Sequence, residues 1–211
     1  ITAIKEPVVD KERGISVSIR LLRPQKIHRG ELIATGFATE QMMRFLEMCI
    51  RYSVSLVIAG ATGSGKTTLL NALLAGIPDN KRIFSIESGS RELSIVREEN
   101  GRIQNNVVCT LSRPSDSPAF DISQEGLVVA SLRFNPDIIA IGEMRDVECY
   151  AAVEASLTGH TVVSTVHSGA GEAAHTRIAL LCQKRFPIDF HTSLLQAGQA
   201  FPMVVYTHKL E

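Results

Sequence analysis

Gly60-Ala-Thr-Gly-Ser-Gly-Lys-Thr-Thr68 is the stretch of sequence that decides the fold. Its first eight residues match the pattern G-x-x-x-x-G-K-[ST] in full. The apolar, β-branched residues 54–59 (VSLVIA) precede it and predict a buried strand. The residues that follow, Lys66–Ala75, have the apolar spacing of a helix that ends before Gly76. A glycine-rich turn between a strand and a helix predicts a loop that binds phosphate.

The residue types in this loop suit a nucleoside triphosphate. Glycines let successive backbone N–H groups turn inward and cradle an anion, and the helix that starts near Gly65 adds its unpaired N–H groups and the positive end of its dipole. Lys66 places a charge on the β- and γ-phosphates, and the Thr67 hydroxyl can bind Mg²⁺. We therefore predict a site for ATP and Mg²⁺ formed by Gly60, Ala61, Thr62, Gly63, Ser64, Gly65, Lys66, Thr67 and Thr68.

Strands and helices alternate along the rest of the chain. Further apolar runs predict strands at residues 82–86, 107–111, 137–141, 161–166 and 203–206. Helical patterns fall at residues 123–133 with Ser123 as the N-cap, at 147–157, at about 172–182, and before Pro202. This alternation predicts an α/β fold with a sheet covered by helices on both faces.

The beginning of the chain has a different pattern. Residues 14–22 (GISVSIRLL) alternate apolar and polar side chains like an antiparallel strand, and we interpret them as the end of a preceding α+β domain that is cut off at Ile1. Residues 23–39 are predicted to be a linker, and Thr39 to cap a helix at residues 40–51. The expected units are therefore residues 1–38 and residues 39–211. The Pro- and Ser-rich residues 112–121 are expected to form a loop.

Composition and cysteine spacing argue for some classes of protein and against others. Lys and Arg together number 22, as do Asp and Glu, so the balanced charge gives no argument for a surface that binds nucleic acid. The four cysteines are far apart and form no Cys-x-x-Cys pair, which argues against a zinc site and favours reduced, buried thiols. No apolar run approaches the roughly 20 residues that cross a bilayer.

A second acidic site is predicted at Glu143. The apolar residues 137–141 lead directly to this glutamate, and sheets of this kind bind ligands at the carboxyl ends of their strands. Glu143 is therefore expected near the phosphates, where it would either hold Mg²⁺ through water or orient the attacking water. The alternative is that Glu143 is a solvated glutamate on a loop. The presence of the phosphate loop makes this alternative the weaker interpretation.

Four segments in this order resemble the hexameric secretion ATPases of type IV secretion, type II secretion and type IV pilus systems. They are GATGSGKTTLLNALL, the acidic segment RIFSIESGSREL, the segment SLRFNPDIIAIGEMRD, and TGHTVVSTVH, which is similar to the family's His box. The resemblance covers roughly residues 14–177. It implies a RecA-like fold, a ring of six subunits, and ATP hydrolysis at the subunit interfaces. It also implies a cytoplasmic location, peripheral to the inner membrane, with secretion or pilus components as partners.

The resemblance also implies roles for individual residues. Glu87 would activate or position water, Glu143 would support Mg²⁺, and His160 and His167 would sense the γ-phosphate. A neutral imidazole N–H can donate to a phosphate oxygen and lose that partner after hydrolysis. The alternative for His160 is a structural histidine at the start of a strand.

Two departures from the family pattern mark this chain as divergent. Ser88-Gly89 follows Glu87 where a second acid is common, and Ser168-Gly169 follows His167 where Ala-Asn is usual. Phosphoryl transfer also needs positive charge against the developing anion. The candidates are Arg20, Arg91, Arg113 and Arg133, with Arg20 and Arg113 ranked first, although each alone is also explained as a solvated surface charge.

The leading interpretation is an ATP-hydrolysing motor subunit for secretion or pilus assembly. A nucleic-acid motor of the same fold is a rival, but the neutral charge and the lack of a basic, aromatic strip count against it. A nucleotide-binding scaffold without turnover is the second rival, and the presence of both Glu87 and Glu143 argues against it.

Overall fold

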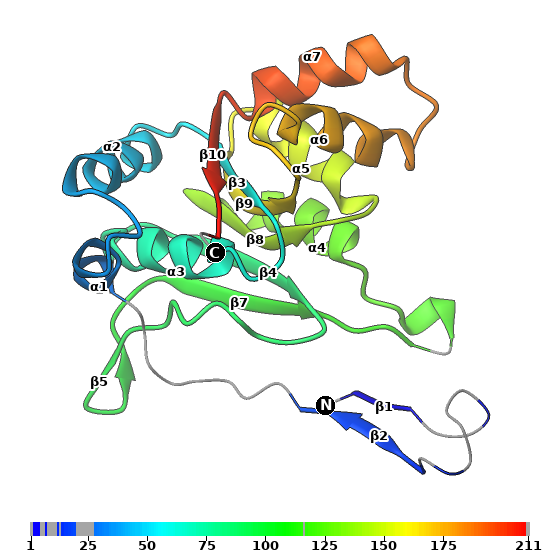
Figure 1. Ribbon diagram of the computed structural model, residues 1–211, viewed down its shortest axis with the longest axis horizontal. Coiled ribbons are helices and arrows are strands. Elements are labelled where there is room, and N and C mark those ends of the chain that lie inside the picture. Colours follow the sequence, from blue (N-terminus) through cyan, green and yellow to red (C-terminus); the bar gives the residue numbers. More distant parts are fainter. Residues whose placement is uncertain are drawn as a thin grey trace.

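A six-stranded parallel sheet forms the centre of the molecule (Figure 1). The computed structural model describes residues 2–4, 7, 12, 14–19, 28–115 and 117–209. The strands lie in the order β10-β3-β9-β8-β4-β7, with every pair parallel. Their bounds are β3 Leu56–Gly60, β4 Ile83–Ser88, β7 Val107–Ser112, β8 Ile138–Met144, β9 Thr161–His167 and β10 Met203–Thr207. Because all six run the same way, their carboxyl ends meet at one edge, where such sheets bind ligands.

Helices cover both faces of this sheet, which confirms the predicted fold class (Figure 1). Alternate residues of each strand face opposite sides, so Leu56 and Ile58 pack with one set of helices and Val57 and Ala59 with the other. The first set is α1 Arg29–Ala34, α2 Glu40–Arg51 and α3 Lys66–Ala75. The second set is α4 Gln124–Ser131, α5 Glu148–Leu157, α6 Ala174–Gln183 and α7 Phe190–Ala200.

Several helix ends lie where the sequence places them. Thr39 caps α2 by accepting a hydrogen bond from the Met42 N–H at 3.2 Å. Ser123 caps α4 in the same way, with the Gly126 N–H at 3.0 Å. Both caps satisfy backbone donors that a helix start leaves without partners. The helix after the phosphate loop has its predicted bounds, Lys66–Ala75, and Gly76 follows it.

The predicted linker contains a short helix in the part that the structure describes. Residues 29–34 form α1, and its Leu32 is buried in the same apolar cluster as α3. Ala38 is buried there as well. Residues 28–38 therefore contact the helices that cover one face of the six-stranded sheet, and the division of the chain at residue 38 stays a prediction. Residues 23–27 lie outside the described residues.

Other local predictions need smaller corrections. The strand expected at residues 14–22 is described as the shorter β2 Ser16–Ser18, which pairs antiparallel with β1 Thr2–Ile4. The loop expected at residues 112–121 contains a short 3₁₀ helix, Pro118–Phe120, and β7 extends to Ser112. A hairpin of β5 Glu98–Glu99 and β6 Arg102–Ile103 was missed, although an Asn-Gly turn at residues 100–101 is the usual signal for one. No helix in the described part of the chain is long and apolar enough to cross a membrane.

Candidate functional site at the phosphate loop

The phosphate loop joins β3 to α3 at the ligand edge of the sheet. Gly63 and Gly65 have φ values of +75° and +91°, a left-handed conformation that costs other residues energy. α3 begins directly afterwards at Lys66, so its first N–H groups and the positive end of its dipole face the concave side of the loop. The backbone in this region therefore suits a polyphosphate.

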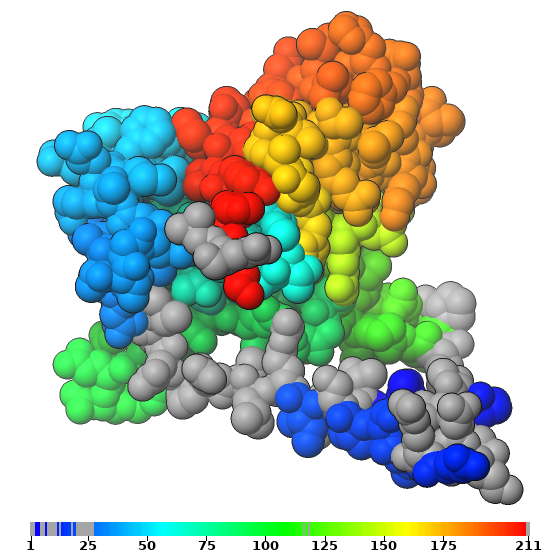
Figure 2. Space-filling model, viewed as in Figure 1, coloured from blue at the N-terminus to red at the C-terminus, as the bar shows by residue number. Residues whose placement is uncertain are grey.

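Gly60 is needed because the loop is packed against β10, one of the two edge strands of the sheet. A Cβ at Gly60 would overlap the backbone carbonyl of Thr207 and lie 2.6 Å from the Ser64 Oγ. The hydroxyls of Ser64 and Thr207 are hydrogen-bonded at 2.8 Å, and Ser64 also donates to the Ala61 carbonyl at 2.8 Å. Figure 2 shows β10 at the surface between the α2 and α6 sides of the molecule.

Gly60→Ala is expected to lower the free energy of unfolding by about 2–3 kcal/mol, because the backbone that a methyl group meets cannot move aside without shifting β10. Gly169→Ala is the matched control, since a Cβ there meets nothing within 4 Å, and its effect is expected within about 0.5 kcal/mol. Denaturant unfolding measures both values. Equal effects of the two substitutions would contradict this packing of the loop.

Lys66, His167 and Glu143 form a chain of polar contacts. The Lys66 side chain is buried, and its Nζ donates to the Ala61 carbonyl at 2.7 Å and lies 3.3 Å from His167 Nδ1. His167 Nε2 lies 2.8 Å from Glu143 Oε1. This arrangement fits a neutral imidazole that carries its proton on Nε2. Burial lowers the pKa of Lys66, and the nearby Glu143 carboxylate opposes that shift.

The register of the sheet explains why these three groups meet. His167 is the last residue of β9 and pairs with Gly60, the last residue of β3 and the first of the phosphate loop. Glu143 lies near the end of the adjacent β8, within the register shift between Ile141 and Met144. Both predicted residues are therefore at the ligand edge of the sheet, as their positions at strand ends led us to expect.

Glu87 and Thr67 complete the site. With Glu143, they line a small pocket of about 50 Å³ whose other lining residues are Ser88, Ser90, Glu92, Gly142 and Arg145. The Glu87 side chain is buried, and its Oε1 accepts hydrogen bonds from the backbone N–H groups of Glu92 and, at 2.8 Å, Leu93. Burial raises the pKa of Glu87, and the two N–H donors oppose that shift. A carboxylate with a raised pKa is a stronger base than an ordinary exposed carboxylate.

Comparison with known proteins matches residues 7–201 to the family described as Type II/IV secretion system protein. The chain belongs to this family. It is 32% identical over 158 residues to the type IV secretion system protein VirB11 of Bartonella quintana, covering 74% of this chain and 42% of that protein. It thus spans less than half the length of this relative. The resemblance drawn from the four sequence segments is confirmed.

Two solved structures share the fold of this secretion-family chain. The crystal structure of the VirB11 ATPase of Brucella suis, in complex with sulphate, superimposes with a TM-score of 0.65 at 25% identity, covering 90% of this chain and 55% of that one. The pilus retraction motor PilT with bound ADP superimposes with a TM-score of 0.64 at 19% identity, covering 97% of this chain and 57% of that one. The second likeness concerns the fold alone.

His160 is not brought to the phosphate loop of this secretion-family chain. It precedes β9, whereas His167 ends it, and seven extended residues span roughly 20 Å. A contact between His160 and a γ-phosphate bound in the same chain is therefore inconsistent with the structure. The structure therefore does not bring His160 together with the other predicted site residues of its own chain, because the two histidines of the motif lie at opposite ends of the same strand.

The candidate arginines separate in the same way. Arg133 lies in a 3₁₀ turn before β8, at the opposite edge of the sheet, so its candidacy is wrong for this chain's own site. Arg113 is exposed directly after β7, where Ser112 pairs with Ser88, and so lies at the ligand edge on the edge strand farthest from β10. Burial raises the pKa of Glu87, and the Arg91 charge is the smallest of the effects that oppose this rise. Arg20 lies outside the described residues.

Arg145 is a pocket residue that the sequence analysis missed. Its guanidinium donates to the Ser88 hydroxyl at 3.0 Å and lines the pocket with Glu87 and Glu143. The buried Glu148 carboxylate fixes the turn by accepting from the Arg145 N–H at 2.7 Å. The position of Arg145, two residues after Glu143 at the end of the same strand, was the sequence signal that could have identified it.

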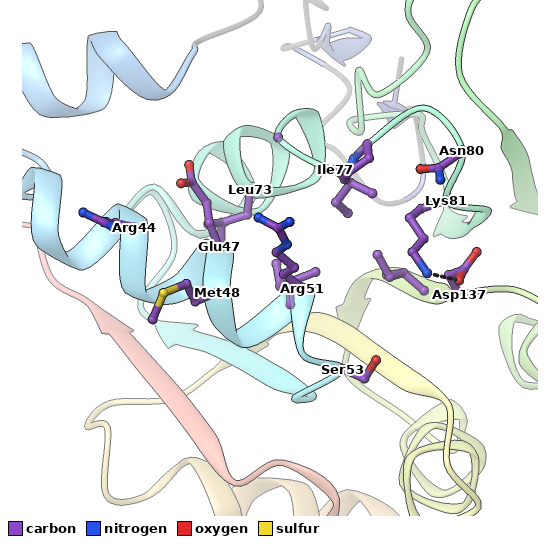
Figure 3. Close-up of a pocket in the computed structure, with 14 residues that line it drawn as sticks. Arg44, Glu47, Met48, Arg51, Ser53, Leu73, Ile77, Asn80, Lys81 and Asp137 are labelled. Atoms are coloured by element: carbon purple, nitrogen blue, oxygen red, sulfur yellow. Dashed lines mark hydrogen bonds and ion pairs between the residues drawn. The ribbon is translucent and has the colours of Figure 1, made fainter.

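A much larger pocket, of about 710 Å³, lies away from these residues (Figure 3). It opens at the amino ends of the strands, between the C-terminal parts of α2 and α3, where Lys81 pairs with Asp137 at 2.7 Å. None of the predicted site residues lines it. Size alone would therefore identify the wrong pocket as the functional site.

Proposed function

We propose that this chain hydrolyses ATP and serves as a motor subunit of a type IV or type II secretion or pilus system. The observation that carries the proposal is the convergence of Lys66, Thr67, Glu87, Glu143 and His167 at the phosphate loop. Membership of the secretion family supports the biological role. The Brucella suis relative, which is named an ATPase, was solved with sulphate, an anion similar to phosphate.

The residues of the site fit a nucleotide with Mg²⁺. The left-handed glycines and the buried Lys66 suit a triphosphate, and the Thr67 hydroxyl and Glu143 carboxylate offer the oxygen ligands that Mg²⁺ prefers. When bound, the ion neutralises charge on the β- and γ-phosphates. Thr67 would bind it directly, and Glu143 would bind it directly or through water.

Glu87 is proposed to act on the attacking water. As the water oxygen bonds to the γ-phosphorus, the bond from that phosphorus to the β,γ-bridging oxygen breaks and the water proton passes to the Glu87 carboxylate. Lys66 would stabilise the negative charge that develops on the phosphate oxygens. His167 would exchange its contact with Glu143 for a γ-phosphate oxygen, and so would report whether that phosphate is present.

We also propose that the active form is a ring of six chains at the cytoplasmic face of the inner membrane. Arg113 supports a site shared between neighbouring chains, because it is exposed at the ligand edge, directly after the edge strand β7. An arginine supplied by a neighbour increases the rate of other nucleotide hydrolases by about 10³–10⁵. Arg20 remains a second candidate for this contribution.

Phosphate release per chain is expected to rise with protein concentration, in step with association measured by sedimentation. Arg113→Ala is expected to remove most of this rise, because the transition state then loses a positive charge from the neighbour. Arg133→Ala, at the opposite edge of the sheet, is the matched control and should behave like the parent chain. Specific activity that is high and constant while the protein remains monomeric would contradict the shared site.

A further inference from the structure

The segment that holds Glu87 is itself held by two asparagine side chains. Residues 91–97 follow β4 without forming a helix or strand. Asn71 donates to the Glu92 carbonyl at 2.9 Å and accepts from the Ser94 N–H at 2.8 Å. Asn105 repeats this pattern three residues later, with the Ile95 carbonyl and the Arg97 N–H, both at 2.8 Å. Each side-chain amide thus takes the place of a peptide group in a neighbouring strand.

Asn71 acts directly on the donors that orient the Glu87 carboxylate. The two groups it binds lie on either side of Leu93, and the N–H groups of Glu92 and Leu93 both donate to Glu87 Oε1. A shift of the Glu92 and Ser94 peptides would therefore move both donors. Asn105 binds peptides that lie after these donors and does not share this contact.

Asn71 also belongs to the helix that begins at the phosphate loop. It lies in α3, four residues after Thr67, and so on the same face of the helix. One rigid helix therefore carries Lys66, Thr67 and the amide that fixes the segment around Glu87. This connection spans 16 residues of sequence from Asn71 to Glu87, and the sequence pattern gave no sign of it.

We propose that Asn71 is a positioning residue for the reaction, holding the Glu92–Ser94 backbone so that its two N–H groups aim the Glu87 carboxylate at the attacking water. This inference rests on the proposed hydrolysis of ATP. The consequence is that α3 sets the distance between the phosphates, which bind at its first turn, and the carboxylate that accepts the proton. Asn71 contacts neither the nucleotide nor the reacting atoms.

The test compares Asn71→Ala with Asn105→Ala in steady-state phosphate release. Asn71→Ala is expected to lower kcat about 10- to 100-fold, because small displacements of catalytic groups have effects of this size. KM and the dissociation constant for ATP should change by less than about 3-fold, since the phosphate loop is intact. Asn105→Ala should leave kcat within about 3-fold of the parent value. Alanine favours the helix at position 71, so folding is not expected to be lost.

A double-mutant cycle separates positioning from a general structural effect. In a Glu87→Gln background, Asn71→Ala is expected to lower kcat by less than about a further 3-fold, because the carboxylate that Asn71 positions is already absent. Equal losses of kcat in Asn71→Ala and Asn105→Ala, or full additivity with Glu87→Gln, would overturn the proposal.

Amide hydrogen exchange keeps this test distinct from that of the proposed function. Exchange at Glu92 and Leu93 should be faster in Asn71→Ala than in the parent chain, and unchanged in Asn105→Ala. Unchanged exchange in Asn71→Ala would overturn the positioning role. If the parent chain releases no phosphate at any concentration, the proposed hydrolysis fails and the catalytic part of this inference fails with it.

Discussion

Lys66→Ala is expected to abolish tight binding of ATP and its turnover. The Lys66 ammonium is buried beside the loop, where a charge-assisted hydrogen bond to phosphate contributes about 1.5–3 kcal/mol. Its loss should weaken ATP binding by roughly 10- to 100-fold. Turnover should fall further, because the Lys66 ammonium also stabilises the negative charge that develops on the phosphate oxygens during transfer. Titration with a fluorescent ATP analogue and a phosphate-release assay measure the two effects.

Lys184→Ala is the matched control for this substitution. The Lys184 ammonium pairs with Asp146 at 3.0 Å, and half of its side chain is exposed. Its removal should change neither binding nor turnover, because surface ion pairs contribute little. If Lys66→Ala binds and hydrolyses ATP like the parent chain, the phosphate loop has been assigned wrongly.

Glu87→Gln is expected to retain nucleotide binding and to lower phosphate release by roughly 10²-fold or more. Glutamine has nearly the volume of glutamate, so the pocket and the phosphate loop survive. Its amide cannot accept the water proton, and this is the step that the buried carboxylate is proposed to perform. The raised pKa of Glu87 makes the group a better base near neutral pH than an ordinary exposed carboxylate.

Glu99→Gln provides the comparison for Glu87→Gln. Glu99 is exposed in the β5–β6 hairpin, so neutralising it changes the total charge equally without touching the pocket. At saturating ATP, Glu87→Gln should release phosphate roughly 10²-fold more slowly than Glu99→Gln. Similar rates would remove Glu87 from the chemistry and leave Glu143 as the remaining acid candidate.

Local sequence patterns predicted most of the sheet because parallel strands buried on both faces have continuous apolar runs. Residues 138–141 (IIAI) show this, and they lie within β8. The same pattern placed Glu143 and His167 correctly at the ligand edge. α1 was missed because six residues give too little helical periodicity, and its formation depends on burial of Leu32 against α3.

The residues that sequence reasoning missed depend on contacts between distant segments. Asn71 reaches the backbone of residues 92–94, and Arg145 reaches the hydroxyl of Ser88, 57 residues away. The position of Arg145 at a strand end was a local signal for that residue, but no local pattern encodes either contact. His160 shows the converse: it is close to His167 in the sequence, but an extended strand separates the two side chains in the structure.

Steady-state phosphate release by the purified chain, with Mg²⁺ and after its chelation, decides whether the chain hydrolyses ATP. We expect release that requires Mg²⁺, that increases as chains associate, and that is lost in Glu87→Gln while ATP remains bound. If ATP binds at the phosphate loop without any Mg²⁺-dependent release, at every protein concentration, the chain is a nucleotide-binding scaffold and not an ATPase.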